Sequence, residues 1–220
     1  MKKMFTVLAL LALALPAFAL QINEIRIDQG GTDNDEYFEL AGDPMESLNG
    51  LTYLVIGDGA GGSGTIEAVV SLDGFMIQAD GYFAMGETTF SGTCGSIDAT
   101  GNLNFENSDN VTHMLVAGFT GADGDDLDTN DDGVLDVTPW TTVYTSLSII
   151  ETPGAEDMYY GMDEVGPDGT FVPGHVLYCP AGWLIGDFNL CTHDTPGEAN
   201  DTCSVSNEDV SFGQLKASFR

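Results

Sequence analysis

The stretch QINEIRI at residues 21–27 decides the fold, because its apolar side chains recur as they do in a half-buried β-strand. Ile22, Ile25 and Ile27 are apolar, and they leave Arg26 pointing outward. Successive side chains of a strand face opposite sides of a sheet, so a core face and a solvent face should separate accordingly. The stretch therefore predicts the first strand of a sheet with one buried face.

Similar runs follow along the chain, separated by Gly, Asn and Asp, and no convincing amphipathic helix precedes the C-terminal region. They cover residues 36–40, 51–56, 65–70, 82–85, 112–119, 141–150, 158–160 and 175–178. Many short strands with turn signals between them are typical of a β-sandwich or barrel. We expect one all-β domain over residues 20–200, because sandwiches of about 200 residues are commonly undivided.

The first 19 residues, MKKMFTVLALLALALPAFA, have the pattern of a cleaved secretory signal peptide. Lys2 and Lys3 precede an apolar run, and small residues stand at the end, where a signal peptidase would cut after Ala19. A membrane helix is the alternative, but the run is short and Pro16 interrupts it. We expect a mature chain without a membrane span that is secreted, at the cell surface or in the periplasm.

The expected mature chain is strongly acidic, because it retains only three Lys and Arg against 35 Asp and Glu. Nucleic acids and anionic membranes are bound through Lys and Arg, so both are disfavoured as partners. Self-repulsion costs stability unless cations lie among the acids, which points to divalent cations. Hydrophobic residues make up 43% of the chain, so we expect a folded core rather than disorder.

Four cysteines lie in the exported part of the chain, at Cys94, Cys179, Cys191 and Cys203. An oxidising compartment favours two disulfides. Zinc is the alternative, but the chain has no C-x-x-C pair. Three pairings are open. Cys179 with Cys191 is preferred, because the short segment between them could turn back on itself.

The acidic stretch DTNDDGVLD at residues 128–136, named the calcium loop, carries the main functional signal. It fits the pattern D-x-[DN]-x-[DN]-G-x-x-D, in which alternate residues turn oxygen atoms inward and the glycine permits a sharp bend. The expected structural Ca²⁺ would be bound by side-chain oxygens of Asp128, Asn130 and Asp132, the carbonyl of Val134, and Asp136 directly or through water.

The calcium loop departs from a complete EF-hand, because its twelfth position is Pro139 instead of a bidentate Glu. A nearby acid must complete the shell, and the candidates are Asp123, Asp125, Asp126 and Glu151. A solvated acidic turn without an ion is the alternative. Magnesium fits less well, because it prefers a tighter octahedron and keeps its waters.

Two other stretches, one rich in glycine and one rich in acids, are interpreted as loops without a ligand. The stretch GDGAGGSG at residues 57–64 lacks the Lys-Ser/Thr pair and the following helix of a phosphate-binding loop, so we expect a hairpin loop. A group of acids near the N-terminus could form a second ion site, although a solvated loop is preferred. These acids are Glu24, Asp33, Asp35, Glu36 and Glu39.

The chain changes character from about residue 201, where a polar linker begins. It leads to Phe212, Leu215 and Phe219 at helical spacing, with Lys216 and Arg220 near the end, where a helix dipole favours cations. Residues 201–220 are interpreted as a linker and a short amphipathic helical tail. The tail either docks on the acidic domain or serves as a sorting or attachment tag.

Catalytic motifs are scarce in this sequence. The only histidines are His113, His175 and His193, and neither H-E-x-x-H nor G-x-S-x-G occurs. His113 lies in a strand-like run and is expected to be packed, whereas His193 beside Asp194 is expected in a surface loop. No catalytic residue is assigned, although 35 acids leave a glycosidase-like carboxylate pair open.

Four segments resemble exported bacterial versions of the lamin tail domain (LTD). They are QINEIRIDQGGTDNDEYFELAG, SLNGLTYLVIGDG, DGYFAMGE and WLIGDFNLCTHDTPGEAN, and the resemblance spans about residues 20–200. It implies an immunoglobulin-like β-sandwich with residues 22–27 as the first strand, 36–40 as its partner and 195–197 as the closing turn. It also implies an accessory module without catalytic residues. The acidic insertion around Asp128 and the four cysteines go beyond the minimal family pattern.

Two functions follow from these observations. The first is a secreted, non-catalytic calcium-binding module with a structural or interaction role, whose partner would be an extracellular protein or a surface polysaccharide. The alternative is a secreted metal-dependent hydrolase, a phosphoesterase or a nuclease accessory, that uses Asp-rich loops as a metal platform. Chelation that lowers stability without any turnover favours the first. Turnover abolished by Asp128→Ala in a folded protein favours the second.

Overall fold

The computed structural model describes residues 19–154 and 158–203. These residues form eleven β-strands and one short 3-10 helix, η1 (Asp201–Cys203). Most of the expected signal peptide, and the expected C-terminal helix, lie outside the described residues. Within the described ranges, no helix has the length and apolar character needed to cross a membrane.

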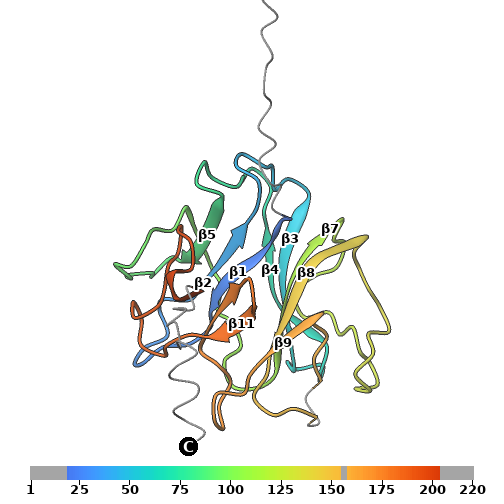
Figure 1. Cartoon of the computed structure of the whole chain (residues 1–220). Coiled ribbons are helices and arrows are strands. Elements are labelled where there is room, and N and C mark those ends of the chain that lie inside the picture. Colours follow the sequence, from blue (N-terminus) through green and yellow to red (C-terminus); the bar gives the residue numbers. More distant parts are fainter. Residues whose placement is uncertain (1–18, 155–157, 204–220) are drawn as a thin grey trace, which may run out of the picture.

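The strands form two sheets (Figure 1). Their bounds are β1 (Gln21–Arg26), β2 (Tyr37–Ala41), β3 (Leu51–Gly57), β4 (Thr65–Ser71), β5 (Tyr82–Glu87), β6 (Ala99–Gly101), β7 (Val111–Ala117), β8 (Thr142–Ile149), β9 (Asp163–Val165), β10 (His175–Cys179) and β11 (Gly182–Ile185). One sheet has the order β11-β10-β1-β2-β5-β6 and the other β4-β3-β7-β8-β9. Neighbours are antiparallel except for β5 with β6 and β8 with β9.

The structure confirms the all-β prediction and every predicted strand except the one at 158–160. There the backbone bonds to side chains instead of a neighbouring strand: Tyr160 N donates to Thr112 Oγ1 at 2.9 Å and Gly161 N to Ser148 Oγ at 2.8 Å. The three strands that sequence analysis missed are β6, β9 and β11, which have only three or four residues. Strands this short give too few positions to show alternation.

The main core lies between the two sheets. Ile22 and Ile25 of β1 belong to the same buried cluster as Tyr53 of β3 and Leu115 of β7. The rings of Phe38 in β2 and Tyr53 are stacked, with centroids 3.8 Å apart. Each such fully buried side chain stabilises the fold by about 1.5–3 kcal/mol, so this interface supplies most of the driving force that holds the sheets together.

The outer face of the five-stranded sheet is also apolar and buried. Leu54 and Ile56 of β3 and Val116 of β7 form a second cluster with Leu127. Leu127 and the partly buried Trp140 belong to residues 118–141, the connection between β7 and β8, named here the apolar cover. The acidic insertion is therefore a folded cover over a sheet face.

The outer face of the six-stranded sheet is polar, and it is buried as well. Arg26 has 0% of its surface exposed, so the predicted solvent face at this strand is wrong. Residues 187–200 lie along this face and are named here the polar cover. Its members bond directly to β1: Asp194 to Arg26, and Asn200 to the carbonyl of Asn23.

Disulfides join Cys94 to Cys191 and Cys179 to Cys203, which confirms two disulfides and shows that the preferred pairing was wrong. Cys179 lies opposite Gly182 in the tight β10–β11 hairpin, and the chain then leaves β10 before it reaches Cys191. One disulfide therefore holds the polar cover at Cys191, within its length, and the other lies just beyond its end, at Cys203. Two disulfides are compatible with an extracellular protein.

Candidate cation sites and a buried polar network

The calcium loop begins directly after the apolar anchor Leu127. The backbone N of Leu127 donates to the carbonyl of Gly64 at 3.0 Å, and its own carbonyl accepts from Asp136 N at 2.7 Å. Residues 57–64 connect the antiparallel strands β3 and β4, which confirms that this stretch is a hairpin loop. The sequence thus places the acids beside an apolar side chain that holds their loop against the hairpin.

Asp128 is the organising residue of the calcium loop, and it is fully buried. Its Oδ1 accepts from Asp132 N at 3.2 Å, and its Oδ2 accepts from Gly133 N and the Tyr160 hydroxyl, each at 2.8 Å. Gly133 has a φ of 83°, in the left-handed region that glycine adopts without strain. Burial opposes ionisation, but these hydrogen bonds outweigh it and hold the pKa of Asp128 below its usual value.

The remaining predicted ligands lie at the exposed surface of the loop. Asp132 Oδ2 accepts from Asn130 Nδ2 at 3.0 Å, and Asp136 Oδ2 accepts from Thr129 Oγ1 at 2.6 Å. Within the described part of the chain, no residue of this loop belongs to a group of three His, Cys, Asp or Glu ligand atoms within 4.8 Å. Binding of an ion here requires the exposed side chains to rotate toward Asp128.

The acids considered for completing the calcium shell lie in different places. Asp126 precedes the loop but is bonded to it, because its Oδ1 accepts from Asp128 N at 3.1 Å. Asp125 instead accepts from a backbone N in its own turn, at Ala122. Glu151 lines a separate cleft. Asp126 is therefore the acid best placed to join Asp128.

A second acidic site is a cleft of about 560 Å³ beside the hairpin loop 57–64. The carboxylates that line it are Asp33, Glu36, Glu67, Glu87, Glu106 and Asp123. Ligand oxygens of Asp58, Glu67 and Glu106 lie within 4.8 Å of one another, a spacing that one cation could bridge. No sequence pattern links Glu67 to Glu106, because they belong to β4 and to the connection between β6 and β7, which only the tertiary fold brings together.

Negative charge is crowded in this cleft. Burial raises the pKa of Glu67 to about 7, and the charges of Glu106 and Asp58 add to the effect. Burial likewise raises the pKa of Glu36 to about 8, although its Oε2 accepts from Phe105 N at 2.8 Å. At pH 7 Glu36 is therefore mostly protonated and Glu67 about half protonated, whereas isolated glutamates are ionised there.

The N-terminal acids do not form the solvated loop that sequence analysis preferred, nor do they meet at one site. Glu24, Asp35, Glu36 and Glu39 are all buried. Glu36 lines the acidic cleft with Asp33. Glu24 and Glu39 instead bond to the polar cover, through Thr195 Oγ1 and Gly197 N. The residues separate because Glu24 and Glu39 lie on β1 and β2, whereas Asp33 and Glu36 belong to the connection before β2.

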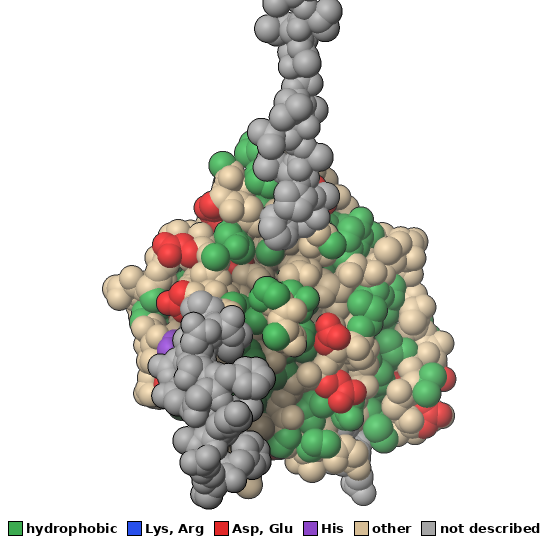
Figure 2. All heavy atoms as spheres, viewed as in Figure 1, with side chains coloured by type: hydrophobic (Ala, Val, Ile, Leu, Met, Phe, Trp, Pro, Cys, Tyr) green, Lys and Arg blue, Asp and Glu red, His purple; other side chains and the backbone are tan. Residues whose placement is uncertain are grey.

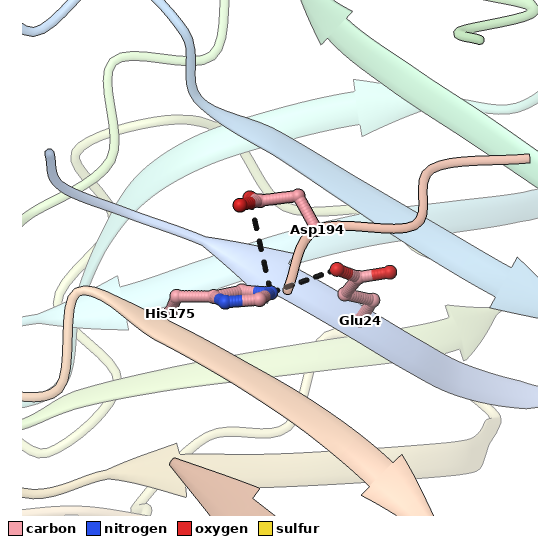
Figure 3. A group of neighbouring side chains, drawn as sticks. All are labelled: Glu24, His175 and Asp194. Atoms are coloured by element: carbon pink, nitrogen blue, oxygen red, sulfur yellow. Dashed lines mark hydrogen bonds and ion pairs between the residues drawn. The ribbon is translucent and has the colours of Figure 1, made fainter. Parts of the chain in front are cut away.

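Glu24, His175 and Asp194 converge beneath the polar cover (Figure 3). His175 Nε2 lies 2.7 Å from Glu24 Oε1 and 3.9 Å from Asp194 Oδ1, and all three side chains are fully buried. Their oxygen atoms are already engaged, since Glu24 also accepts from the Tyr37 hydroxyl at 2.5 Å and from Thr195 Oγ1 at 2.9 Å. The carboxylate oxygens of the group are therefore taken up in a buried hydrogen-bond network, whereas His175 Nδ1 has no hydrogen-bond partner among the described residues.

Arg26 fastens this network to the polar cover. Its Nε and Nη2 donate to the two carboxylate oxygens of Asp194 at 2.5 and 2.8 Å. Its other donors reach the carbonyls of Asp28, Asp187 and Phe188. Burial opposes the charge of Asp194, but the hydrogen bond from Arg26 and nearby positive charge hold its pKa below the usual value. A satisfied, fully buried pair of this kind positions a segment and offers no access to a substrate.

The other two histidines lie where the sequence predicted. His113 is fully buried in β7, with Nδ1 2.8 Å from the Tyr53 hydroxyl, and burial lowers its pKa to about 3. His193 is exposed in a loop. His175 is the residue whose surroundings sequence analysis did not anticipate, because its acidic partners come from β1 and the polar cover.

Comparisons with known proteins add no identification. No family model matches the chain, and no curated protein or solved structure matches it. The resemblance to lamin tail domains therefore remains a hypothesis carried by the four sequence segments.

Proposed function

We propose that this chain is a secreted, non-catalytic calcium-binding module of lamin tail type, with an immunoglobulin-like sandwich, a short C-terminal helix and a structural or interaction role. The observation that supports it best is Asp128, a buried and ionised carboxylate at the first position of a calcium-type loop. The left-handed Gly133 at the sixth position has the conformation that such a loop requires. Calcium would be the loop's structural ligand.

The chemistry of the loop suits calcium. Calcium takes six to eight oxygen ligands with flexible geometry at about 2.3–2.6 Å. Asp128 is already oriented, and the exposed Asn130, Asp132 and Asp136 can turn toward it at little conformational cost. An ion there would neutralise repulsion between the acids and hold the loop in one conformation. Extracellular calcium modules bind with dissociation constants of about 10⁻⁴–10⁻³ M, so millimolar calcium is the relevant range.

Thermal unfolding of the full chain tests this proposal, because an ion that binds only the folded state must raise the midpoint. At calcium about 100-fold above the dissociation constant, the expected gain is about 2.7 kcal/mol, a rise of several degrees. Asp132→Ala should abolish the rise, whereas Glu164→Ala, an exposed acid on β9, should retain it. Equal midpoints in calcium and in chelator would contradict the proposal, as would a full calcium response in Asp132→Ala.

The alternative, a secreted metal-dependent hydrolase, is favoured by a different observation. The acidic cleft holds Glu67 with a pKa of about 7 beside Asp58 and Glu106, and carboxyls poised near neutrality can transfer protons. Its test is metal-dependent hydrolysis of bis(p-nitrophenyl) phosphate by the full chain. Turnover lost in Glu67→Gln or Asp128→Ala, with unchanged folding, would favour the hydrolase over the module.

A further inference from the structure

An apolar cleft of about 520 Å³ lies on the side of the molecule where β1 ends and β10 begins. Phe171, Val172 and Phe188 supply its apolar surface. Phe171 is 71% exposed and Phe188 45% exposed, so two large aromatic side chains remain in solvent beside one concave surface. Clustered exposed apolar groups of this kind mark interaction sites more often than scattered ones do.

The segments that line the cleft are held in place by hydrogen bonds and close packing. The backbone carbonyl of Phe188 accepts from Arg26 Nη1 at 3.2 Å, which ties this part of the polar cover to the buried network. The Phe188 ring lies so close to Gly174 that a Cβ there would approach it to 2.9 Å. Opposite, the backbones of Asp168 and Phe171 bond to each other in a tight turn. The two aromatic rings are thus presented by ordered backbone.

Three of the residues that line this cleft are acidic, Asp28, Glu151 and Asp168, and they are called here its acidic rim. A ligand that fits must combine apolar side chains with positive charge. Figure 2 shows a face of the molecule on which no Lys or Arg of the described residues is visible. Among the described residues, Arg26 is the one Lys or Arg, and it is buried against Asp194.

The same chain carries a segment with the required chemistry. Lys216 and Arg220 are the only Lys and Arg after Arg26 in the sequence. Arranged as a helix, Phe212, Leu215 and Phe219 would share one narrow stripe, and both cations would lie along one edge of it. An apolar stripe with a basic edge matches an aromatic cleft with an acidic rim.

We propose that residues 212–220 dock into this cleft of the same molecule, with their apolar stripe against Phe171 and Phe188 and their two cations toward the rim carboxylates. This interaction does not depend on calcium. Surface ion pairs contribute only about 0–1 kcal/mol each, so the aromatic contacts supply most of the affinity and the charges orient the segment.

The connection between the domain and this segment is long enough. Cys203 is bonded to Cys179 at the end of β10, whereas Val172 in the cleft precedes the start of that strand. The seven residue-to-residue steps from 172 to 179 extend over at most about 23 Å. Residues 204–211 can span about 26–29 Å when extended. A short tether also keeps the local concentration of the segment high, in the millimolar range.

Zero-length carbodiimide cross-linking of the full chain in chelator tests the proposal, because Lys216 is the only lysine after Lys3. Peptide mapping should find Lys216 joined mainly to Asp28, Glu151 or Asp168. Phe171→Ser should lower this yield at least fivefold. Met162→Ser, which truncates a side chain that is 66% exposed and does not line the cleft, should leave it unchanged.

A second variant makes the test independent of any effect on the domain. The double substitution Phe212→Ser and Phe219→Ser alters only the segment and should lower the yield as Phe171→Ser does. Cross-links spread over other acids and unaffected by either variant would overturn the proposal. Cross-links that join two chains, and that grow with protein concentration, would also overturn it, because the occupant would then be a second copy.

Discussion

The two outer faces of this sandwich are both buried, but by opposite chemistry. On the five-stranded sheet, Leu54 and Ile56 are closed off by the apolar cover and its anchor Leu127. On the six-stranded sheet, Arg26 is closed off by the polar cover through Asp194. The apolar cover is held by burial of apolar surface, whereas the polar cover is held by hydrogen bonds and an ion pair.

Because of this difference, substitutions in the two covers should lower stability in different ways. Apolar burial is non-directional and loses stability in proportion to what is removed. A buried ion pair fails more abruptly, since removal of one partner leaves the other charged and desolvated. Two disulfides fasten the polar cover, at Cys191 within it and at Cys203 just beyond its end. The apolar cover contains no cysteine and carries the exposed acids of the calcium loop.

The largest expected effect is that of Arg26→Met. It leaves Asp194 buried without its partner, and we expect a loss of about 3–5 kcal/mol in the free energy of unfolding. Urea denaturation measures this loss. The double variant Arg26→Met with Asp194→Leu should recover much of it, because no unpaired charge remains. A loss below about 1 kcal/mol in the single variant would mean that the polar cover is not held by this pair.

Leu127→Ala should come next, with a loss of about 2–4 kcal/mol, because it opens a cavity beneath the apolar cover. The calcium-dependent rise in midpoint should shrink as well, since the loop loses its anchor. Val137→Ala is the matched control, because Val137 is 52% exposed in the same cover. A greater loss for Leu127→Ala than for Arg26→Met would reverse the ranking of the two covers.

A smaller effect concerns pH and the acidic cleft. The folded-state pKa of Glu36 is about 8, above the unfolded value near 4.5. Its contribution is therefore fully present below about pH 4.5 and is lost as pH rises through 8. In chelator, Glu36→Gln should lose less stability than the native chain between pH 5 and 8, by roughly 1–3 kcal/mol. Parallel curves from urea denaturation would show that Glu36 ionises normally.

The smallest expected effect is that of Tyr160→Phe, which removes the hydroxyl bonded to Asp128. The expected loss is about 1–2 kcal/mol at pH 7, because the acceptor is charged. Asp128 has a lowered pKa, so its contribution is present above about pH 4 and is lost as pH falls through the folded value. The variant should shift that acid loss to higher pH in a pH titration of stability. Tyr144→Phe, at an exposed position, should change neither the stability at pH 7 nor the pH at which stability is lost in acid.

The calcium loop and the buried network differ in how much the sequence says about them. The loop is a local pattern over residues 128–136, in which Asp128 accepts hydrogen bonds from Asp132 N and Gly133 N, and calcium binding there stays a prediction. The network had no local signal. Glu24 and Arg26 look like solvent-facing residues of a strand, and only the return of residues 187–200 buries them.

The sequence by itself determined the all-β fold and most strand positions, because a period of two and the turn residues between runs are local properties. It also located the acidic loop. Only the tertiary structure decided that Cys94 pairs with Cys191, that Glu67 meets Glu106, and that the polar face of β1 is buried. Alternation along a strand distinguishes its two faces, but it does not specify which distant segment covers each of them.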